Sequence, residues 1–359
     1  MRSVDSHWAM DGWRLVDLFC GVGGFRLGLE GLGARTVYSC DNDKTARKWY
    51  ARFFGAPPEG ADIRQVERLP EHDILCAGFP CVAFSRAGQK RGRGDERGRL
   101  FDEVVRLVAA SPPQRAILLE NVPRILTAEG GAMHRHICRS LGELGFEVHH
   151  RILNAGHHGV PQQRRRCFYV CLRRPVRRPF EWPAPQPASC PVLEDILLPE
   201  PKLIERGDIT CAEAPKAGDA VQRRYPRPEA AAAHYSRAQQ MGYIGRNLQG
   251  QRLYHRRGLA PTLETWHPVR VWQDRRTVRI LQPREFARLM GFPDRLPVPP
   301  TEEEANKVYG NSVPVPVVRQ LGACVAAACE ATPPATPPAT PATPGTPDTP
   351  LTRWLRSYQ

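Results

Sequence analysis

The chain has 359 residues, enough for one large domain or two unequal ones. Its formal net charge of +14 favours a polyanionic partner, with nucleic acid first and an anionic membrane surface second. No run of 18 apolar residues and no apolar signal core at the N-terminus are present, so neither a membrane span nor secretion is expected.

The first predicted unit is a strand over 14–20, a glycine turn and a helix from residue 25. This order is typical of the first βα unit of a doubly wound fold, in which glycines let backbone amides approach a ligand. Arg26 stands where G-x-G-x-x-G has its third glycine, so a dinucleotide site and a nucleotide-dependent oxidoreductase are disfavoured.

The second predicted strand, 36–40, ends at Asp41. An acid about 20 residues after the first glycine is placed to bind ribose hydroxyls, although an ordinary loop or N-cap acid is the alternative. A nucleoside without pyrophosphate fits both signals, and S-adenosylmethionine is the obvious candidate.

The stretch 73–81 reads as a buried parallel strand that runs into Gly78 and is stopped by Pro80. Ligands of open α/β sheets lie outside the carboxyl ends of strands, so Cys81 is placed where chemistry takes place. Residues 82–99 are rich in glycine and arginine and predict a mobile, cationic loop. A thiol beside cations is held partly as thiolate, whereas a small buried cysteine is the alternative.

Another buried strand, 114–120, ends in Glu120, which is either a loop acid or a carboxyl held at low dielectric for acid catalysis. Further on, alternation from Arg164 to Phe168 predicts that Arg164 and Arg166 share one face of a strand. The spacing of Cys167 and Cys171 lacks a second ligand pair, so no metal is expected.

A Pro- and Arg-rich stretch at 175–182 marks a boundary. Residues 190–278 have weak periodicity and many basic and aromatic residues, which suit a nucleic-acid face or the core of a small irregular domain. A helix is predicted over 284–292, and a loop at 309–316 leads into a last helix. The Thr/Pro/Ala repeat that follows predicts a disordered, passive tail.

Taken in order, these stretches resemble the motifs of the C5-cytosine-specific DNA methyltransferases, in particular the short bacterial enzymes of restriction–modification type. The resemblance covers residues 14–328. Residues 16–24 resemble the first cofactor motif and Pro80-Cys81 the nucleophile motif. The segments 120–122 and 162–166 match the two motifs that hold the target base, and 279–294 and 310–313 match the last two.

Several positions depart from the family pattern. Asp41 replaces the usual Glu, Asn42 stands where an aromatic residue is common, and Val82 replaces the usual Gln or Asn. The segment 264–267 replaces a glycine-rich stretch after Thr262.

The resemblance implies an α/β fold of class I S-adenosylmethionine-dependent type, Rossmann-like and doubly wound around a mostly parallel sheet, with a smaller, irregular, β-rich target-recognition domain. The implied domains are 1–190 with 304–330 for catalysis, 191–303 for target recognition, and 331–359 as a disordered tail. The implied activity is methylation of cytosine C5 in duplex DNA at a short specific sequence, with S-adenosyl-L-methionine as the methyl donor and base flipping. The protein is expected to act as a monomer in the bacterial cytoplasm, at the nucleoid, with a restriction endonuclease as a possible partner.

The resemblance also implies roles for individual residues. The catalytic residues are Cys81, Glu120, Arg164 and Arg166, with Arg166 on the base and Arg164 beside it or on the backbone. Cofactor-binding residues are Phe19, Gly21, Gly23, Gly24, Asp41, Asn42, Asp62, Ile63, Gly78, Pro80, Leu100, Asn311, Ser312 and Val313. DNA-binding residues are Ser85, Arg97, Gln249, Arg252, Tyr254 and Thr262.

Two rival functions share this scaffold. One is an RNA methyltransferase, as in the tRNA-methylating branch of the family, against which the segment at Thr262 argues. The other is a binding protein that has lost turnover, which Val82 in place of the usual residue suggests.

Overall fold

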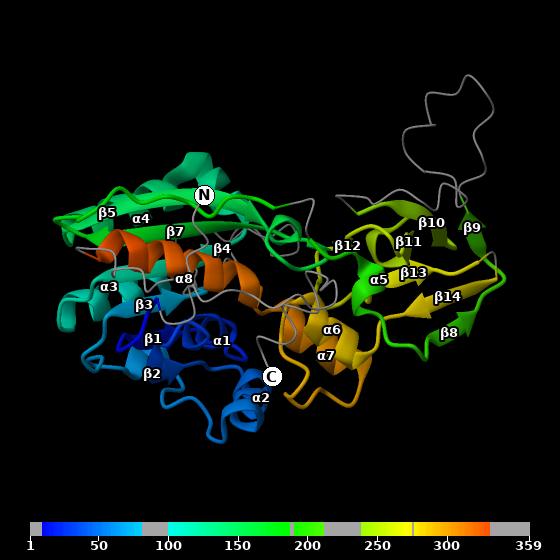
Figure 1. Ribbon diagram of the computed structural model, residues 1–359, viewed down its shortest axis with the longest axis horizontal. Coiled ribbons are helices and arrows are strands. Elements are labelled where there is room, and N and C mark those ends of the chain that lie inside the picture. Colours follow the sequence, from blue (N-terminus) through cyan, green and yellow to red (C-terminus); the bar gives the residue numbers. More distant parts are fainter. Residues whose placement is uncertain (1–8, 81–99, 187–189, 212–237, 275, 331–359) are drawn as a thin grey trace, which may run out of the picture. The chain divides into compact units, whose positions relative to one another are not determined.

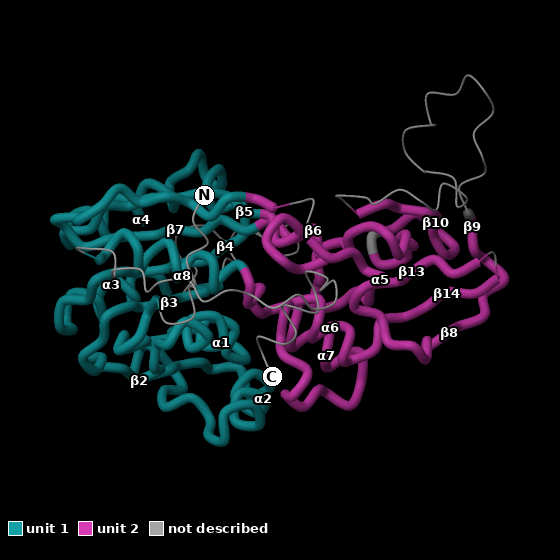
Figure 2. Tube along the Cα trace, viewed as in Figure 1, with its two compact units in different colours: residues 1–153, 166–184, 317–358 teal, residues 154–165, 185–316, 359 magenta. Residues whose placement is uncertain are grey.

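The computed structural model describes residues 9–80, 100–186, 190–211, 238–274 and 276–330 (Figure 1). Cys81, Val82, Ser85, Arg97 and the tail after residue 330 lie outside the described residues. The chain divides into two compact units (Figure 2). Unit 1 comprises 1–153, 166–184 and 317–358, and unit 2 comprises 154–165, 185–316 and 359.

Unit 1 is built on a six-stranded sheet in the order β2-β1-β3-β4-β7-β5. Its strands are β1 (Arg14–Leu18), β2 (Arg35–Cys40), β3 (Ile74–Ala77), β4 (Ala116–Asn121), β5 (Phe146–Asn154) and β7 (Arg165–Arg173). The first four strands in the sheet are parallel, and β7 is antiparallel to β4. The expectation of a mostly parallel sheet is therefore confirmed, and the carboxyl ends of β1, β3 and β4 lie at one edge.

Helices cover both faces of this sheet. They are α1 (Gly24–Glu30), α2 (Lys44–Phe54), α3 (Leu100–Ala110), α4 (Ala132–Glu143) and α8 (Val315–Cys329). Val16 and Leu18 of β1 share a core cluster with Phe101 of α3 and Ile137 of α4. Since side chains alternate along a strand, Asp17 points to the other face. There α8 packs on α1 so closely that a Cβ on Gly322 would lie 2.4 Å from Leu29.

Unit 2 has a second six-stranded sheet in the order β8-β14-β13-β11-β10-β9. These strands are β8 (Lys202–Glu205), β9 (Ile209–Cys211), β10 (Gln240–Ile244), β11 (Arg252–Tyr254), β13 (Arg270–Trp272) and β14 (Thr277–Ile280). All pairs are antiparallel except β11 with β13. A separate parallel pair joins β6 (Gln162–Gln163) to β12 (Ala260–Pro261). The expected smaller, β-rich part is thus confirmed.

Short helices complete the two units. The α-helices of unit 2 are α5 (Leu193–Ile196), α6 (Pro283–Leu289) and α7 (Glu302–Gly310). The 3-10 turns are η2 (Ile63–Gln65), η5 (Pro123–Leu126), η6 (Ala128–Gly131), η7 (Ala155–His157) and η10 (Gln249–Gln251). At the start of α6, Glu285 is fully buried, accepts from the Gln282 amide and is ion-paired with Arg279. This buried pair fixes the entry to α6.

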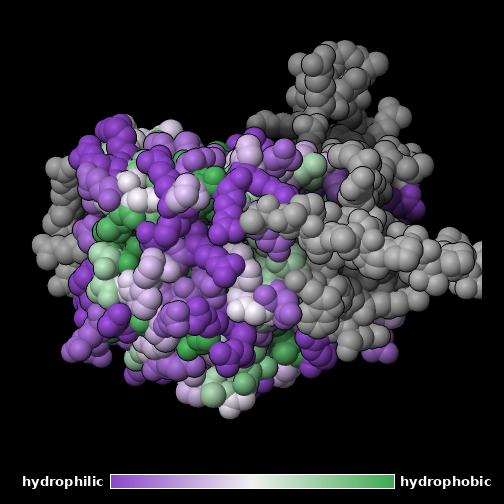
Figure 3. Space-filling view, turned by 60° about the vertical axis from the view of Figure 1, so that its left-hand side comes forward, coloured by the Kyte–Doolittle hydropathy of each residue, from purple (hydrophilic) through white to green (hydrophobic). Residues whose placement is uncertain are grey.

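The run from α7 through α8, Glu302–Cys329, is long and apolar enough to span a membrane. However, 67% of its most apolar window is buried inside the protein, which is typical of a core helix. One face of the molecule is drawn in Figure 3, where hydrophilic residues prevail and apolar residues form only small patches between them.

Candidate active site

The glycine turn after β1 is in direct contact with Asp41. The Gly21 amide donates to Oδ2 of Asp41 at 2.8 Å, and the Asp43 amide donates to Oδ1 at 2.8 Å. Asp43 in turn caps α2 by accepting from the Ala46 amide. Burial raises the pKa of the Asp41 carboxyl, and the two amide hydrogen bonds oppose that shift. The glycine turn after β1 and the loop at Asp41, both predicted to bind S-adenosylmethionine, are therefore joined by a hydrogen bond.

The turn itself needs an unusual backbone. Phe19 and Gly21 both have φ of 55°, and Gly23, the N-cap of α1, has φ of 81°. A Cβ on Gly23 would also lie 2.4 Å from the Phe54 ring, whereas a Cβ on Gly21 would meet nothing within 4 Å. Gly23 is thus required by packing, and open space remains beside Gly21. A carboxylate at the rim of an open glycine turn fits the nucleoside part of S-adenosylmethionine.

The other expected cofactor residues of unit 1 differ in burial and in their partners. Asp62 caps η2 and forms an ion pair with Arg64 at 2.7 Å, which lowers the pKa of the Asp62 carboxyl. Ile63 is buried and Asn42 is exposed. Gly24 and Leu100 are the first residues of α1 and α3. Only part of the Asp62 carboxylate is therefore left for a ligand.

Glu120 and Arg166 form an ion pair at the carboxyl end of β4. Arg166 Nε lies 3.0 Å from Glu120 Oε1, and their side chains are 15% and 12% exposed. Glu120 pairs with Phe168 across the sheet, so the start of the antiparallel strand β7 brings Arg166 to the end of β4. The second oxygen, Oε2, would lie 3.8 Å from a Cβ on Gly78. The pair thus stands directly beside the segment that leads to Cys81.

Asn121 is a site residue for which the sequence analysis predicted no separate role. Its Nδ2 donates to the Phe79 carbonyl at 3.0 Å and its Oδ1 accepts from the Val122 amide at 2.9 Å. The side chain is 3% exposed. Phe79 is two residues before Cys81, and Pro80 between them is exposed. Asn121 therefore fixes the backbone of Phe79, two residues before Cys81. The sequence signal that could have identified it is a buried Asn directly after the acid that ends a strand.

Arg164 does not share the surroundings of Arg166. It precedes β7, is 3% exposed, and belongs to unit 2. Its guanidinium donates to the carbonyls of Leu263 at 3.3 Å, Gly310 at 3.0 Å and Ser312 at 2.8 Å. The prediction that alternation puts both arginines on one face was wrong, because the strand begins only at Arg165. Arg164 was expected either beside the base-binding Arg166 or on the protein backbone, and its three bonds to main-chain carbonyls favour the backbone.

The two glutamines before Arg164 contact the segment at Thr262 and Leu263. Gln162 accepts from the Leu263 amide and donates to the Leu289 carbonyl, both at 3.0 Å. The Gln163 carbonyl accepts from Thr262 Oγ1 at 2.7 Å. The segment around Thr262 is therefore held by side chains and backbone of the stretch that ends at Arg164.

The last motif follows α7. Asn311 is exposed, whereas Ser312 and Val313 are 5% and 7% exposed, and the Ser312 carbonyl is the one bound by Arg164. A Cβ on Gly310 would lie 3.4 Å from Glu264 and Thr265. The loop after α7 thus packs against Glu264 and Thr265 within unit 2.

The expected DNA-reading residues differ in accessibility. Arg252 is half-buried and donates from Nε to Asn247 Oδ1 at 3.2 Å. Tyr254 is only 7% exposed and burial raises its pKa, so its ring supports the second sheet. Gln249 is the first residue of η10, and η10 ends directly before Arg252. Within the described residues, Arg252 and Thr262 therefore remain the accessible candidates for DNA contact.

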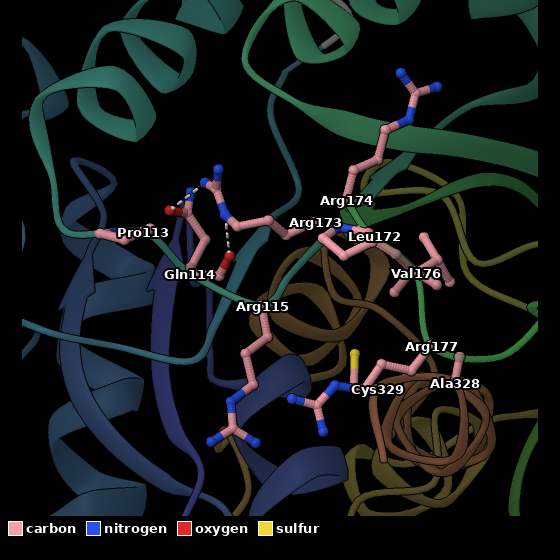
Figure 4. A pocket seen from close by; sticks show the side chains of 11 residues that line it. Pro113, Gln114, Arg115, Leu172, Arg173, Arg174, Val176, Arg177, Ala328 and Cys329 are labelled. Atoms are coloured by element: carbon pink, nitrogen blue, oxygen red, sulfur yellow. Dashed lines mark hydrogen bonds between the residues drawn. The ribbon is translucent and has the colours of Figure 1, made fainter. Parts of the chain in front are cut away.

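A cavity of unit 1 lies at the start of β4 (Figure 4). It has a volume of about 520 Å³ and lies between the start of β4, the end of β7 and the end of α8. Its lining includes Gln114, Arg115, Arg173 and Arg177. Arg173 is held by the carbonyl and side chain of Gln114 (Figure 4). Since Glu120 is at the opposite end of β4, this cavity is separate from the site.

Comparisons with known proteins agree with this arrangement. The family model described as C-5 cytosine-specific DNA methylase matches residues 13–326. The chain is 35% identical over 324 residues to the type II methyltransferase M.HhaI of Haemophilus parahaemolyticus, covering 87% of this chain and 94% of that protein. It is 33% identical over 324 residues to M.NlaX of Neisseria lactamica, covering 89% and 98%.

Solved structures show the same fold. A putative DNA modification methyltransferase from an Escherichia coli prophage superposes with a TM-score of 0.65 at 21% identity, covering 88% of this chain and 99% of that one. The Dnmt2 methyltransferase of S. pombe superposes with a TM-score of 0.60 at 17% identity, covering 87% and 98%.

Proposed function

Because the chain belongs to the C-5 cytosine-specific DNA methylases, and is therefore a DNA cytosine-5 methyltransferase that uses S-adenosylmethionine, we propose how its own residues carry the reaction. Cys81 is the nucleophile, Glu120 and Arg166 hold the target cytosine, and Asn121 positions the start of the loop that carries Cys81. The ion pair of Glu120 and Arg166 beside Gly78 is the observation that supports this assignment.

The chemistry requires a nucleophile other than the base itself. Carbon C5 of cytosine is too electron-poor to attack a methyl group directly. Addition of the Cys81 thiolate to C6 forms an S–C6 bond and leaves an enamine that is nucleophilic at C5, and a thiolate suits this role because it adds and leaves readily. The bound cofactor supplies the electrophilic methyl group. Loss of the C5 proton to water and elimination of the Cys81 thiolate then restore the aromatic ring.

Glu120 and Arg166 stabilise the charge that builds up on the ring. Glu120 in its protonated form donates its proton to N3, where negative charge develops once sulfur adds to C6, and its other oxygen accepts from the exocyclic N4 amino group. Arg166 donates to O2 and, through its 3.0 Å contact, keeps Glu120 in place. Inside a duplex N3 is base-paired and the faces of C5 and C6 are covered by stacking, so the cytosine must leave the stack.

Cofactor binding is proposed for the glycine turn and the acids around it. The open space beside Gly21 admits the ligand, Asp41 accepts from the ribose hydroxyls, and the partly used Asp62 contacts the adenine side. In the last motif, Ser312 and Val313 are nearly buried, so we propose that the exposed Asn311 makes the ligand contact of that loop.

Unit 2 is proposed to choose the DNA sequence. Arg252 and Thr262 are the candidates for base-edge or phosphate contacts, and Gln249 for the space that the cytosine vacates. Tyr254 is too buried to keep the DNA contact that the sequence suggested. We propose that the enzyme works as a monomer inside the cell and methylates a short site that a cognate endonuclease also recognises. Methylome sequencing of DNA from expressing cells identifies that site.

The decisive experiment uses Cys81→Ser and DNA that carries 5-fluorocytosine at the methylated position. We expect the variant to bind cofactor as the parent does but not to methylate, because a hydroxyl is poorly ionised and adds badly to C6. The parent should form a covalent adduct with the fluorinated DNA, since fluorine cannot leave as a cation. Near-normal turnover by Cys81→Ser, or an adduct through another cysteine, would remove Cys81 from this role. Methylation of tRNA instead of duplex DNA would favour the RNA branch.

A further inference from the structure

Two large apolar side chains of unit 2 are exposed to water on neighbouring loops. Among the described residues, Trp266 is 84% exposed and Leu248 is 58% exposed, the two highest values for large hydrophobic side chains. Leu203 and Ile204, both on strand β8, follow with 45% and 36%. Scattered apolar residues on a surface are ordinary, but two on adjoining loop tips mark a contact surface.

The two loops touch at a fixed point. A Cβ on Gly250 would lie 2.4 Å from the ring of His267, so that ring packs directly on the backbone two residues after Leu248. The Leu248 carbonyl accepts from the Gln251 amide at 2.9 Å. Glu264 and His267 form an isolated antiparallel bridge, which places Trp266 in the turn between them. Both apolar tips therefore belong to one local surface.

The turn that carries Trp266 is held firmly from behind. The preceding Leu263 has its amide bound by Gln162 and its carbonyl bound by Arg164. On the other side, Gly310 packs against the backbone of this turn, since a Cβ on Gly310 would lie 3.4 Å from Glu264 and from Thr265. A large side chain on a rigid support loses little conformational entropy on binding, which suits an anchoring contact.

The surroundings of the two tips fit a duplex better than a protein. Exposed Arg246 and half-buried Arg252 flank Leu248 in sequence, and Gln249 is its direct neighbour. Apolar wedges accompanied by arginines are the combination with which proteins enter a base stack while they hold its phosphates. A protein partner would instead favour a broader apolar area than two tips.

We propose that Leu248 and Trp266 insert into the base stack of the bound DNA and hold base pairs apart while the cytosine is out of the stack. The inference rests on the base flipping of the proposed function, and adds two wedge residues to it. Each wedge replaces stacking that the DNA loses when the cytosine leaves, so it stabilises the flipped complex and contributes nothing to cofactor binding.

The test uses DNA with 2-aminopurine at the target position, whose fluorescence rises when the base leaves the stack. In Trp266→Ala and Leu248→Ala we expect the fraction of flipped base in the saturated complex to fall and the Kd for DNA to rise about tenfold, in line with stacking contacts. Trp266→Phe should recover most of the signal because it keeps an aromatic face. Leu203→Ala, at a comparably exposed leucine of β8, is the matched control and should behave as the parent.

The outcomes separate this inference from the function on which it rests. If both alanine variants flip the base as the parent does, or if Leu203→Ala is impaired as much, the wedge assignment is overturned. If the Kd for DNA rises but the flipped fraction is unchanged, Leu248 and Trp266 contact the DNA backbone and do not enter the base stack. This result also overturns the wedge assignment. If the parent methylates the unmodified DNA but gives no fluorescence rise with the 2-aminopurine DNA, flipping itself fails, and the wedge role fails with it.

Discussion

Arg166 Nε and Glu120 Oε1 lie 3.0 Å apart at the carboxyl end of β4, and both side chains are mostly buried. Replacing Glu120 by Gln keeps the shape but removes the charge and the proton-sharing oxygen. We expect kcat to fall on the order of 10²-fold, the usual size of a general-acid contribution, with cofactor affinity unchanged. Steady-state kinetics measure this. Glu147→Gln, on β5, is the control, and an unchanged kcat in Glu120→Gln would make Glu120 a structural cap.

Asn121 predicts a second effect on turnover. Asn121→Asp keeps the oxygen that accepts from Val122 but loses the donor to the Phe79 carbonyl, which is the start of the Cys81 loop. We expect a destabilisation of about 1–3 kcal/mol, because a buried carbonyl loses its partner, together with a lower kcat. Urea unfolding and single-turnover rates check both. Parental kcat in this variant would show that the loop is positioned by other contacts.

Arg164 should matter for stability more than for chemistry. Arg164→Lys cannot form the fork to three carbonyls, and we expect a loss of about 2–4 kcal/mol in the free energy of unfolding. The neighbouring exposed Arg165→Lys should change it little. If Arg164→Lys unfolds at the parental urea concentration and loses only turnover, Arg164 contacts the base instead of the backbone.

The buried Asp17 predicts a pH dependence of stability. Burial raises the pKa of this carboxyl well above its usual value, with Asp41 and Glu30 also raising it and Arg26 opposing them. The folded state therefore keeps a proton that the unfolded state releases above about pH 4, so stability falls as pH rises toward the folded pKa, by up to about 1.4 kcal/mol per pH unit.

Asp17→Asn removes this titration. The variant should be more stable than the parent at neutral pH, and its advantage should grow as pH rises from about 5. Urea unfolding at several pH values measures the difference. An advantage that stays constant with pH would mean that Asp17 is ionised, or shielded, in the folded protein.

Much of unit 1 could be predicted because its signals are local. The strand that ends at Asp41 and the strand that ends at Glu120 are continuous apolar runs with glycine or polar residues at their ends, and the structure has β2 and β4 there. The predicted strand from Asp73 begins one residue later, since the Asp73 carboxylate instead binds Arg14 and Arg115.

Unit 2 was predicted only as a small β-rich part. The strands of its six-stranded sheet are three to five residues long, as in β11 and β10, which is too short for a period of two to be visible. Arg164 shows the second limit. Its partners are carbonyls about 100 to 150 positions further along the chain, and main-chain atoms carry no sequence signal.

The main-chain contacts of Gln162 and Arg164 have a consequence for how the recognised DNA sequence changes in evolution. Gln162 and Arg164 hold Leu263, Leu289, Gly310 and Ser312 through amide and carbonyl groups. Every residue has a main-chain carbonyl and every residue except proline has an amide hydrogen, so these contacts do not depend on which side chains stand at positions such as Thr262 or Trp266. Under the proposed function, mutations at these positions change the recognised DNA sequence without weakening the main-chain contacts that hold the segment, so the recognised site can diversify on a constant frame.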